Sequence, residues 1–153
     1  MASLSETSAP RADATETVIH ASAVAVANRA LVILGPAGSG KSALALDLMA
    51  YGATLLADDR TRLVRTDGQI LASAPPTLPP LIEARGIGLL NATLAPPTPV
   101  AAAIDLGQTE TGRLPPMRQI TFLDRPVPLL HKPERGSFAP ALLQYLKAGQ
   151  SHP

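Results

Sequence analysis

The apolar residues near the start of the chain form short runs with a turn between them. Residues 18–26 (VIHASAVAV) are rich in β-branched and small apolar side chains, which predicts one strand or a pair of strands. Asn28 and Arg29 are turn residues, and the apolar run 30–34 follows them as a further strand. The pattern therefore predicts a hairpin that leads directly into the glycine-rich segment at residue 35.

A helical pattern follows that segment. Leu44 and Leu48 recur at the spacing of one helix face, and Gly52 stands where a helix commonly ends. We expect one helix of about three turns that begins at Lys41. The apolar run 54–57 then predicts a short strand, so strand, loop, helix and strand follow one another in close succession.

The next stretch carries a hairpin signal. The runs 62–65 and 69–72 flank the turn residues Asp67 and Gly68. Asp-Gly between two alternating runs is typical of a tight hairpin turn. Strands of both directions would then share one sheet, and the predicted fold class is α/β with a mixed sheet and few helices.

Prolines divide the distal half of the chain into short pieces. Residues 74–80 have neither a helical nor a strand pattern and predict an extended connection. Further on, residues 100–106 predict a buried strand and residues 119–123 a weaker one. A last helix, which we expect Ser137 to cap, would bury Phe138, Leu142, Leu143 and Leu146.

The length of 153 residues corresponds to one domain, which we expect to span residues 17–150. Residues 1–16 are small and polar with no periodic apolar face, so we expect a flexible tail there. The sequence has no secretory apolar segment and no run approaching the ~20 apolar residues of a membrane span. These features indicate a cytoplasmic protein with no membrane partner.

Charge and residue usage argue against nucleic-acid binding and against a metal held by cysteine or histidine. The formal net charge is +1 and no block of lysine or arginine occurs, so we expect no nucleic-acid partner. The chain has no cysteine, and its three histidines show no ligand spacing. Any bound metal should therefore be magnesium with oxygen ligands.

The segment 35–42 has the Walker A pattern, with a predicted strand before it and a predicted helix after it. Glycines let backbone N–H groups of such a loop converge on phosphate oxygens, at the positive end of the helix. Lys41 would reach the outer phosphates and Ser42 a magnesium ion. A glycine-rich turn that matches by chance is the alternative. The expected nucleotide-binding residues are Gly35, Pro36, Ala37, Gly38, Ser39, Gly40, Lys41 and Ser42.

Two carboxylates end the strand at residues 54–57. Magnesium that bridges the outer phosphates needs an oxygen ligand from a neighbouring strand, and Asp58 can supply it. Asp59 then points elsewhere, toward the transferring group, where it could exchange a proton. A solvated turn is the alternative, since aspartate is common after strands.

The order of four segments resembles a known family. IHASAV, GPAGSGKS, YGATLLADDRTRL and IEARGIGLLNA, in this order, are similar to the motif series in the catalytic domain of bacterial HPr kinase/phosphorylase, in its short form without the N-terminal domain. The resemblance covers residues 18 to about 92 and is faint beyond Asn91. It implies a P-loop core of the type shared with phosphoenolpyruvate carboxykinase, and homo-oligomers in long members.

The resemblance also implies an activity and a set of roles. The family uses ATP to phosphorylate a serine of HPr, a carrier of the phosphotransferase system, and many members remove that phosphate by phosphorolysis. By position, Ser42, Asp58 and Glu83 would hold Mg²⁺, and Asp59 would be the acid/base. His20 matches the family histidine beside that acid/base, although a lone histidine on an apolar strand is more often a core residue.

One more segment matches the family's pattern and bears on the reverse reaction, and this sequence departs from the family's pattern in two places. Arg85, followed by Gly86, matches a segment associated with dephosphorylation, where an arginine stabilises additional phosphate charge. A surface loop with an ion pair is the alternative. Ala43 replaces a common glutamate, and the family's later Gly-Arg-Asn segment has no counterpart. Arg113 or Arg125 could replace that missing arginine.

Two other functions stay open. A P-loop kinase of a small metabolite would normally need an arginine-bearing lid, for which the sequence gives no clear signal. An ATP-sensing regulatory module would bind nucleotide without transferring phosphate, but the intact Lys41, Ser42, Asp58 and Asp59 favour catalysis. We therefore expect a protein-serine kinase that acts on HPr or an HPr-like phosphocarrier.

Overall fold

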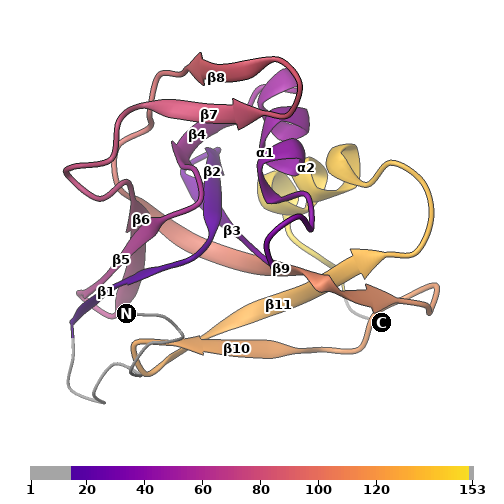
Figure 1. The fold of residues 1–153 in the computed structure, drawn as a ribbon. Helices are drawn as coiled ribbons and strands as arrows, with labels where there is room; N and C mark the ends of the chain where they lie inside the picture. The colour runs from indigo at the N-terminus through magenta and orange to yellow at the C-terminus, as the bar shows by residue number, and fades with distance from the viewer. Residues whose placement is uncertain (1–14, 152–153) are drawn as a thin grey trace.

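A computed structural model describes residues 15–151 (Figure 1). The elements follow the order β1 (Glu16–Ile19), β2 (Ser22–Val26), β3 (Arg29–Leu34), α1 (Lys41–Ala50), β4 (Thr54–Ala57), β5 (Thr61–Thr66), β6 (Gln69–Ser73), β7 (Leu81–Ala84), β8 (Gly88–Asn91), β9 (Thr98–Glu110), β10 (Gln119–Phe122), β11 (Arg125–Pro133) and α2 (Ala139–Ala148). The tail expected at residues 1–16 lies outside this part as far as residue 14, and Glu16 already belongs to β1. No helix within residues 15–151 is long and apolar enough to cross a membrane.

Nine of the described strands form one mixed sheet in which the main path runs β1-β5-β6-β9-β3-β2-β4. The long strand β9 joins its parts, because it pairs with β6 at its start, with β3 in its middle and with β11 toward its end. The β3–β9 and β9–β11 pairs are parallel, and the other pairs are antiparallel. Strands β7 and β8 form a separate hairpin above α1 in Figure 1.

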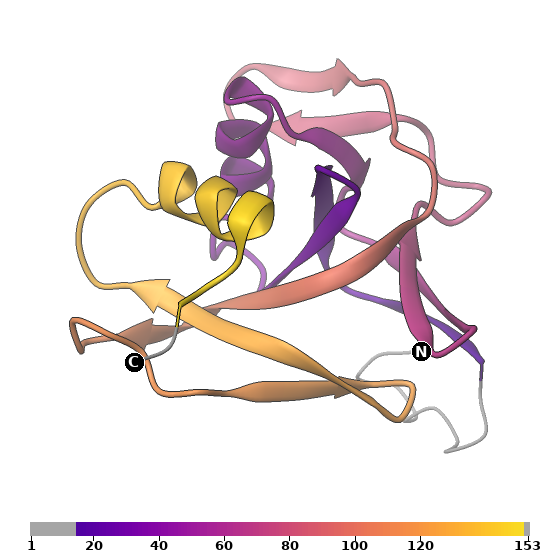
Figure 2. The same cartoon turned by 180° about the vertical axis from the view of Figure 1, so that it is seen from behind.

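Apolar residues cover both faces of the sheet. Leu31 and Ile33 of β3 point toward the two helices, which lie side by side on one face (Figures 1 and 2). Ala30 and Val32, the alternate residues of the same strand, belong to a second core on the opposite face. Since successive side chains of a strand point to opposite faces, an almost continuous apolar strand such as β3 is buried on both sides.

The strand directions bring three chain segments to one edge of the sheet. Strand β2 runs antiparallel to both β3 and β4, which are its two neighbours. The end of β3 at Leu34, the end of β4 at Ala57 and the start of β2 at Ser22 therefore meet at the same edge. The glycine-rich loop, the aspartate pair and His20 all extend from these points.

The predicted fold class is confirmed: the protein has a mixed α/β fold with a large sheet and two described helices. The strand at Thr54–Ala57 and the hairpin around Asp67 and Gly68 are found where the sequence predicted them. The first turn lies at Ala27 and Asn28, both with positive φ, one residue earlier than expected. The last helix is capped at Phe138 without a side-chain hydrogen bond, so the expected cap by Ser137 was wrong.

Candidate active site

The glycine-rich loop joins β3 to α1 as an open cradle. Gly40 is the N-cap of α1 and has a φ of 101°, which the left-handed region allows easily only for glycine. The first turn of α1 contains no acidic residue, so the positive end of this helix is not neutralised by its own side chains. The Ser39 hydroxyl is buried without a hydrogen-bond partner among the described residues. A phosphate group in the loop would meet N–H groups and a free hydroxyl.

Lys41 folds back over this loop. Its ammonium group donates to the carbonyl oxygens of Gly35 at 2.8 Å and Pro36 at 3.3 Å, and the residue is only 7% exposed. Within residues 15–151 no carboxylate forms an ion pair with it. A nearly buried cation that is held by carbonyl dipoles alone favours an added anion, because an uncompensated buried charge is costly.

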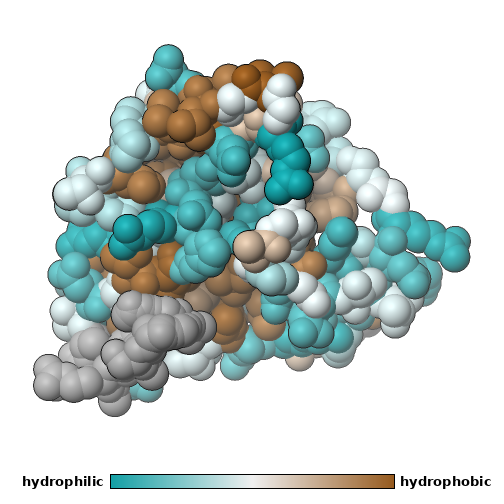
Figure 3. Space-filling view, in the orientation of Figure 1, coloured by the Kyte–Doolittle hydropathy of each residue, from teal (hydrophilic) through white to brown (hydrophobic). Residues whose placement is uncertain are grey.

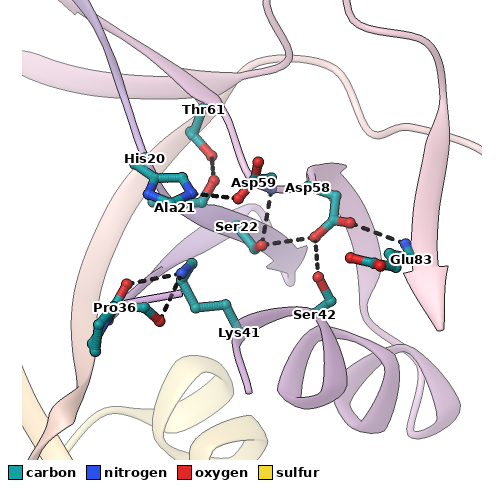
Figure 4. Close-up of polar contacts among 11 residues, drawn as sticks. His20, Ala21, Ser22, Pro36, Lys41, Ser42, Asp58, Asp59, Thr61 and Glu83 are labelled. Carbon is teal, nitrogen blue, oxygen red and sulfur yellow. Dashed lines mark hydrogen bonds and ion pairs between the residues drawn. The ribbon is translucent and has the colours of Figure 1, made fainter. Parts of the chain in front are cut away.

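Asp58 is the centre of the polar contacts drawn in Figure 4. Its Oδ1 accepts hydrogen bonds from the hydroxyls of Ser42 at 2.7 Å and Ser22 at 2.8 Å, and its Oδ2 accepts the backbone N–H of Glu83 at 3.0 Å. Three segments that are far apart in the sequence thus fix one carboxylate beside the first turn of α1. The side-chain oxygens of Ser42 and Asp58 thus lie together, and both are oxygen donors of the kind that magnesium prefers.

Asp59 faces away from Asp58 and toward His20. The imidazole Nε2 of His20 lies 2.5 Å from Asp59 Oδ1, and the backbone N–H of Asp59 donates to the Ser22 hydroxyl at 3.1 Å. The side chains of His20 and Asp59 are 53% and 64% exposed. The adjacent aspartates therefore have different surroundings: Asp58 is held by donors next to the loop, and Asp59 is open to a molecule from solvent.

Ser22 is a site residue that the sequence did not single out, although it belongs to the quoted segment IHASAV. Its side chain is completely buried, and it contacts Asp58 through its hydroxyl proton and Asp59 through its oxygen. The two-residue spacing from His20 was an available signal, because residues i and i+2 of an extended segment point to the same side. The contact itself depends on β2 lying next to β4, which the sequence alone did not establish.

The signature segment forms the β7–β8 hairpin beside this site. The backbone of Glu83 contacts Asp58, and Figure 4 shows its carboxylate on the side of Asp58 and Ser42. Arg85 lies exposed in the turn between β7 and β8, and no hydrogen bond within the described residues joins it to the aspartate pair. Ile87 and Leu89 are 77% and 68% exposed, and apolar atoms gather over this hairpin above the polar middle of the same face (Figure 3).

The two arginines considered for the missing distal charge lie in different places. Arg113 lines a cavity near the ends of β9 and β11. Arg125 begins β11 near the Asp67-Gly68 turn, at the other end of that strand. Of the two, only Arg113 is on the side of the sheet where the parallel strands β3 and β9 end.

The described residues fit a magnesium nucleotide. They contain no group of three or more His, Asp or Glu side chains that could hold a metal by themselves. Magnesium in nucleotide sites is commonly bound by one or two carboxylates together with hydroxyl, phosphate and water oxygens. Ser42 and Asp58 offer such a partial set next to the open loop, and the unpartnered Ser39 hydroxyl and the Lys41 ammonium supply polar groups for phosphate.

Comparisons with known proteins show the family of this chain. A model of the HPr Serine kinase C-terminal domain family matches residues 12–95, more than half of the chain. The chain belongs to this family. The matched residues include the glycine-rich loop, the aspartate pair, His20 and the β7–β8 hairpin.

Individual relatives carry the corresponding name. The HPr kinase/phosphorylase of Clostridium botulinum is 36% identical over 80 residues, which are 52% of this chain and 26% of that protein. The HPr kinase/phosphorylase of Stenotrophomonas maltophilia is 37% identical over 89 residues, 58% of this chain and 27% of that protein. The aligned part thus spans about a quarter of the length of these curated relatives.

A solved structure extends the likeness in fold beyond the matched segment. The Hpr(Ser) kinase/phosphatase from Coxiella burnetii superposes with a TM-score of 0.70 and 24% sequence identity, and the match covers 85% of this chain and 87% of that chain. The superposition therefore includes part of the distal half, where the sequence resemblance is faint.

Proposed function

We propose that this protein is an ATP- and Mg²⁺-dependent protein-serine kinase that acts on an HPr-like phosphocarrier. The observation that carries this proposal is a continuous hydrogen-bonded path between the phosphate loop and an exposed acid/base pair. The path runs from Ser42 through Asp58 and Ser22 to the backbone of Asp59, whose carboxylate contacts His20. It holds the phosphate loop and the His20–Asp59 pair at one edge of the sheet.

In this proposal the loop residues 35–42 hold the phosphates of ATP, with Lys41 at the outer ones. Ser42, Asp58 and Glu83 hold Mg²⁺, which when bound neutralises charge on the β- and γ-phosphates. Glu83 contributes through its side chain as well as through the N–H that orients Asp58. Among these three residues, Glu83 contacts Asp58 only through its backbone N–H, so its metal role rests on the position of its carboxylate.

Asp59 acts as the acid/base. It accepts the proton of the carrier's serine hydroxyl as that oxygen forms a bond to the γ-phosphorus, and the bond to the β–γ bridging oxygen breaks to release ADP. In the reverse direction an oxygen of inorganic phosphate forms a bond to the phosphorus of the phosphoserine as the bond from the serine oxygen to phosphorus breaks. Pyrophosphate leaves, and Asp59 returns a proton to the serine oxygen. His20 is a positioning residue that orients the Asp59 carboxylate. Arg85 would stabilise the additional phosphate charge of the reverse reaction.

The surroundings of Asp59 favour a protein acceptor over a small metabolite. The His20–Asp59 pair is more than half exposed, and the apolar residues Ile87 and Leu89 lie on the neighbouring hairpin. A small-molecule acceptor would be expected to occupy an enclosed pocket at the transferring group. In this role the protein would act in the cytoplasm together with the phosphotransferase carriers, and homo-oligomer formation stays a prediction.

The test combines the full chain, γ-labelled ATP, Mg²⁺ and the HPr-like carrier of the same organism. We expect label on a serine of the carrier, and its loss with Lys41→Ala. The matched control Lys147→Ala changes an exposed lysine at the end of α2 and should transfer label as the wild type does. Nucleotide binding without transfer would favour a sensor, and label on a metabolite would favour a small-molecule kinase; either result contradicts the proposal.

A further inference from the structure

The distal half of the protein contains a cavity that does not include the aspartate pair. This cavity has a volume of ≈ 700 Å³ and lies between the end of β9, the end of β11 and helix α2. Such a volume is within the usual range for sites that bind small molecules. Its lining residues all follow residue 95, so the segment matched by the family model does not include them.

Strand β9 connects the cavity with the phosphate loop, although no residue of the loop lines the cavity itself. Ile104 lines it, and in the parallel β3–β9 pair Ile104 lies opposite Ile33, two residues before the loop begins at Gly35. Further along β9, Gly107 is packed so closely on the loop that an added Cβ would lie 3.1 Å from Cδ of Pro36. Strand β9 thus runs past the loop and continues to Glu110, which forms part of the cavity wall.

The strand order shows on which side of the phosphate loop the cavity lies. The sheet runs β4-β2-β3-β9, with β11 beside β9, so Asp58 and the cavity are on opposite sides of the loop that follows β3. Ligands of such sheets bind outside the carboxyl ends of the parallel strands. A triphosphate that directs its outer end toward Asp58 would direct its other end toward β9 and β11.

The lining has the chemistry of a nucleoside site. Phe138, the N-cap of α2, and Tyr145 within α2 both line it, and they are two of the four aromatic residues (Phe, Tyr) in the chain. Aromatic side chains bind bases of any sequence by stacking on their faces. Glu110 accepts a hydrogen bond from Arg118, which lowers the pKa of Glu110 and keeps its carboxylate ionised as an acceptor. A carboxylate acceptor suits the hydroxyls of a ribose.

We propose that this cavity binds the nucleoside part of ATP, with the base against Phe138 and Tyr145 and the ribose near Glu110. The inference rests on the proposed function, because the direction of the nucleotide follows from phosphate binding in the loop. Arg113, on the same wall, would donate hydrogen bonds to the base or the ribose rather than to the phosphates in the loop. An acceptor site is disfavoured here, since the cavity and Asp59 lie on different sides of β3.

The affinities of the full chain for two ligands distinguish binding in the loop from binding in the cavity. Mg·ATP should use both sites, whereas Mg·tripolyphosphate has no nucleoside and should use the loop alone. We expect Phe138→Ala and Arg113→Ala each to weaken ATP binding by about fivefold or more, as loss of a stacking contact or of hydrogen bonds to the nucleoside does. Tripolyphosphate affinity should stay within about twofold, and Arg125→Ala should alter neither ligand.

The outcomes distinguish the two proposals. Arg113 is exposed, so its variant should fold even if Phe138→Ala does not. Two results would overturn the nucleoside site without contradicting phosphate binding in the loop. In the first, a variant loses affinity for ATP and for tripolyphosphate equally. In the second, neither Arg113→Ala nor a folded Phe138→Ala loses affinity for ATP. If the wild type binds neither ligand, or if Lys41→Ala binds tripolyphosphate as tightly as the wild type, the proposed function fails and this inference fails with it.

Discussion

The imidazole Nε2 of His20 and the carboxylate Oδ1 of Asp59 lie 2.5 Å apart, although 39 positions separate them in the chain. His20 lies in the break between β1 and β2, and Asp59 lies just beyond β4 with a φ of 68°. Aspartate tolerates this left-handed conformation better than most residues, and its N–H is held by the Ser22 hydroxyl. The backbone thus turns Asp59 away from Asp58 and toward the histidine.

This geometry predicts the effect of Asp59→Asn. The amide keeps the shape of the side chain but cannot accept the serine proton, so phosphoryl transfer should fall by about 10²–10⁴-fold while ATP affinity stays near the wild-type value. Rapid-quench transfer and equilibrium nucleotide binding measure the two quantities. The control is Asp67→Asn in the exposed β5–β6 turn, where φ is also positive. Wild-type transfer by Asp59→Asn would remove Asp59 from its role.

Ser22 should affect magnesium affinity. Its hydroxyl donates to Asp58 but is not one of the proposed metal ligands, and removal of such a supporting group typically weakens metal affinity by about 10–100-fold. We expect Ser22→Ala to raise the Mg²⁺ concentration needed for ATP binding accordingly. Ser73→Ala, which changes another buried serine on β6, serves as the control. An unchanged Mg²⁺ requirement would show that Asp58 needs no support from β2.

Gly35→Ala tests the shape of the loop. Gly35 has a φ of 149°, and an added Cβ would collide with the Ser39 hydroxyl and lie 3.2 Å from Cβ of Leu106. We expect a loss of about 1–3 kcal/mol in the free energy of unfolding, together with weaker tripolyphosphate binding. Gly52→Ala has a positive φ but open space around it, so it reports backbone strain alone. If both variants bind tripolyphosphate equally well, close packing at Gly35 is not needed for the cradle.

Tyr145 should make the protein sensitive to alkaline conditions. Burial raises the pKa of Tyr145 in the folded state above its unfolded value. The stability linked to this group is therefore fully present below the unfolded pKa, near ~10, and is lost as the pH rises through the folded pKa. Urea unfolding from pH 8 upward should show a smaller alkaline loss for Tyr145→Phe than for the wild type. Tyr51→Phe, at a residue that is 56% exposed, should not reduce the loss.

Local patterns were sufficient for the elements near the start of the chain. The turn chemistry of Asp67 and Gly68 and the apolar run at Thr54–Ala57 specify their structure within a few residues. Strand β11 was missed because Pro126, Pro128 and Pro133 interrupt it, and proline argues against a central strand. Its pairing with β9 is long-range and has no local signal.

For the candidate site too, the sequence indicated local features but not how they are arranged in space. The glycine-rich loop and the aspartate pair have local signatures, and the roles assigned to them remain predictions that the variants above test. Their arrangement depends on β2 lying between β3 and β4, which brings His20 and Ser22 to the same edge. Periodicity cannot give that order, so the contact of Ser22 with both aspartates required the structure.

A crystal structure of this chain with Mg²⁺ and a non-hydrolysable ATP analogue would test the proposed site most directly. We expect the phosphates within the loop 35–42, the metal on Ser42 and Asp58, and the terminal phosphate on the side of Asp59. A nucleotide bound outside the loop, or a terminal phosphate turned away from Asp59, would contradict the proposed function.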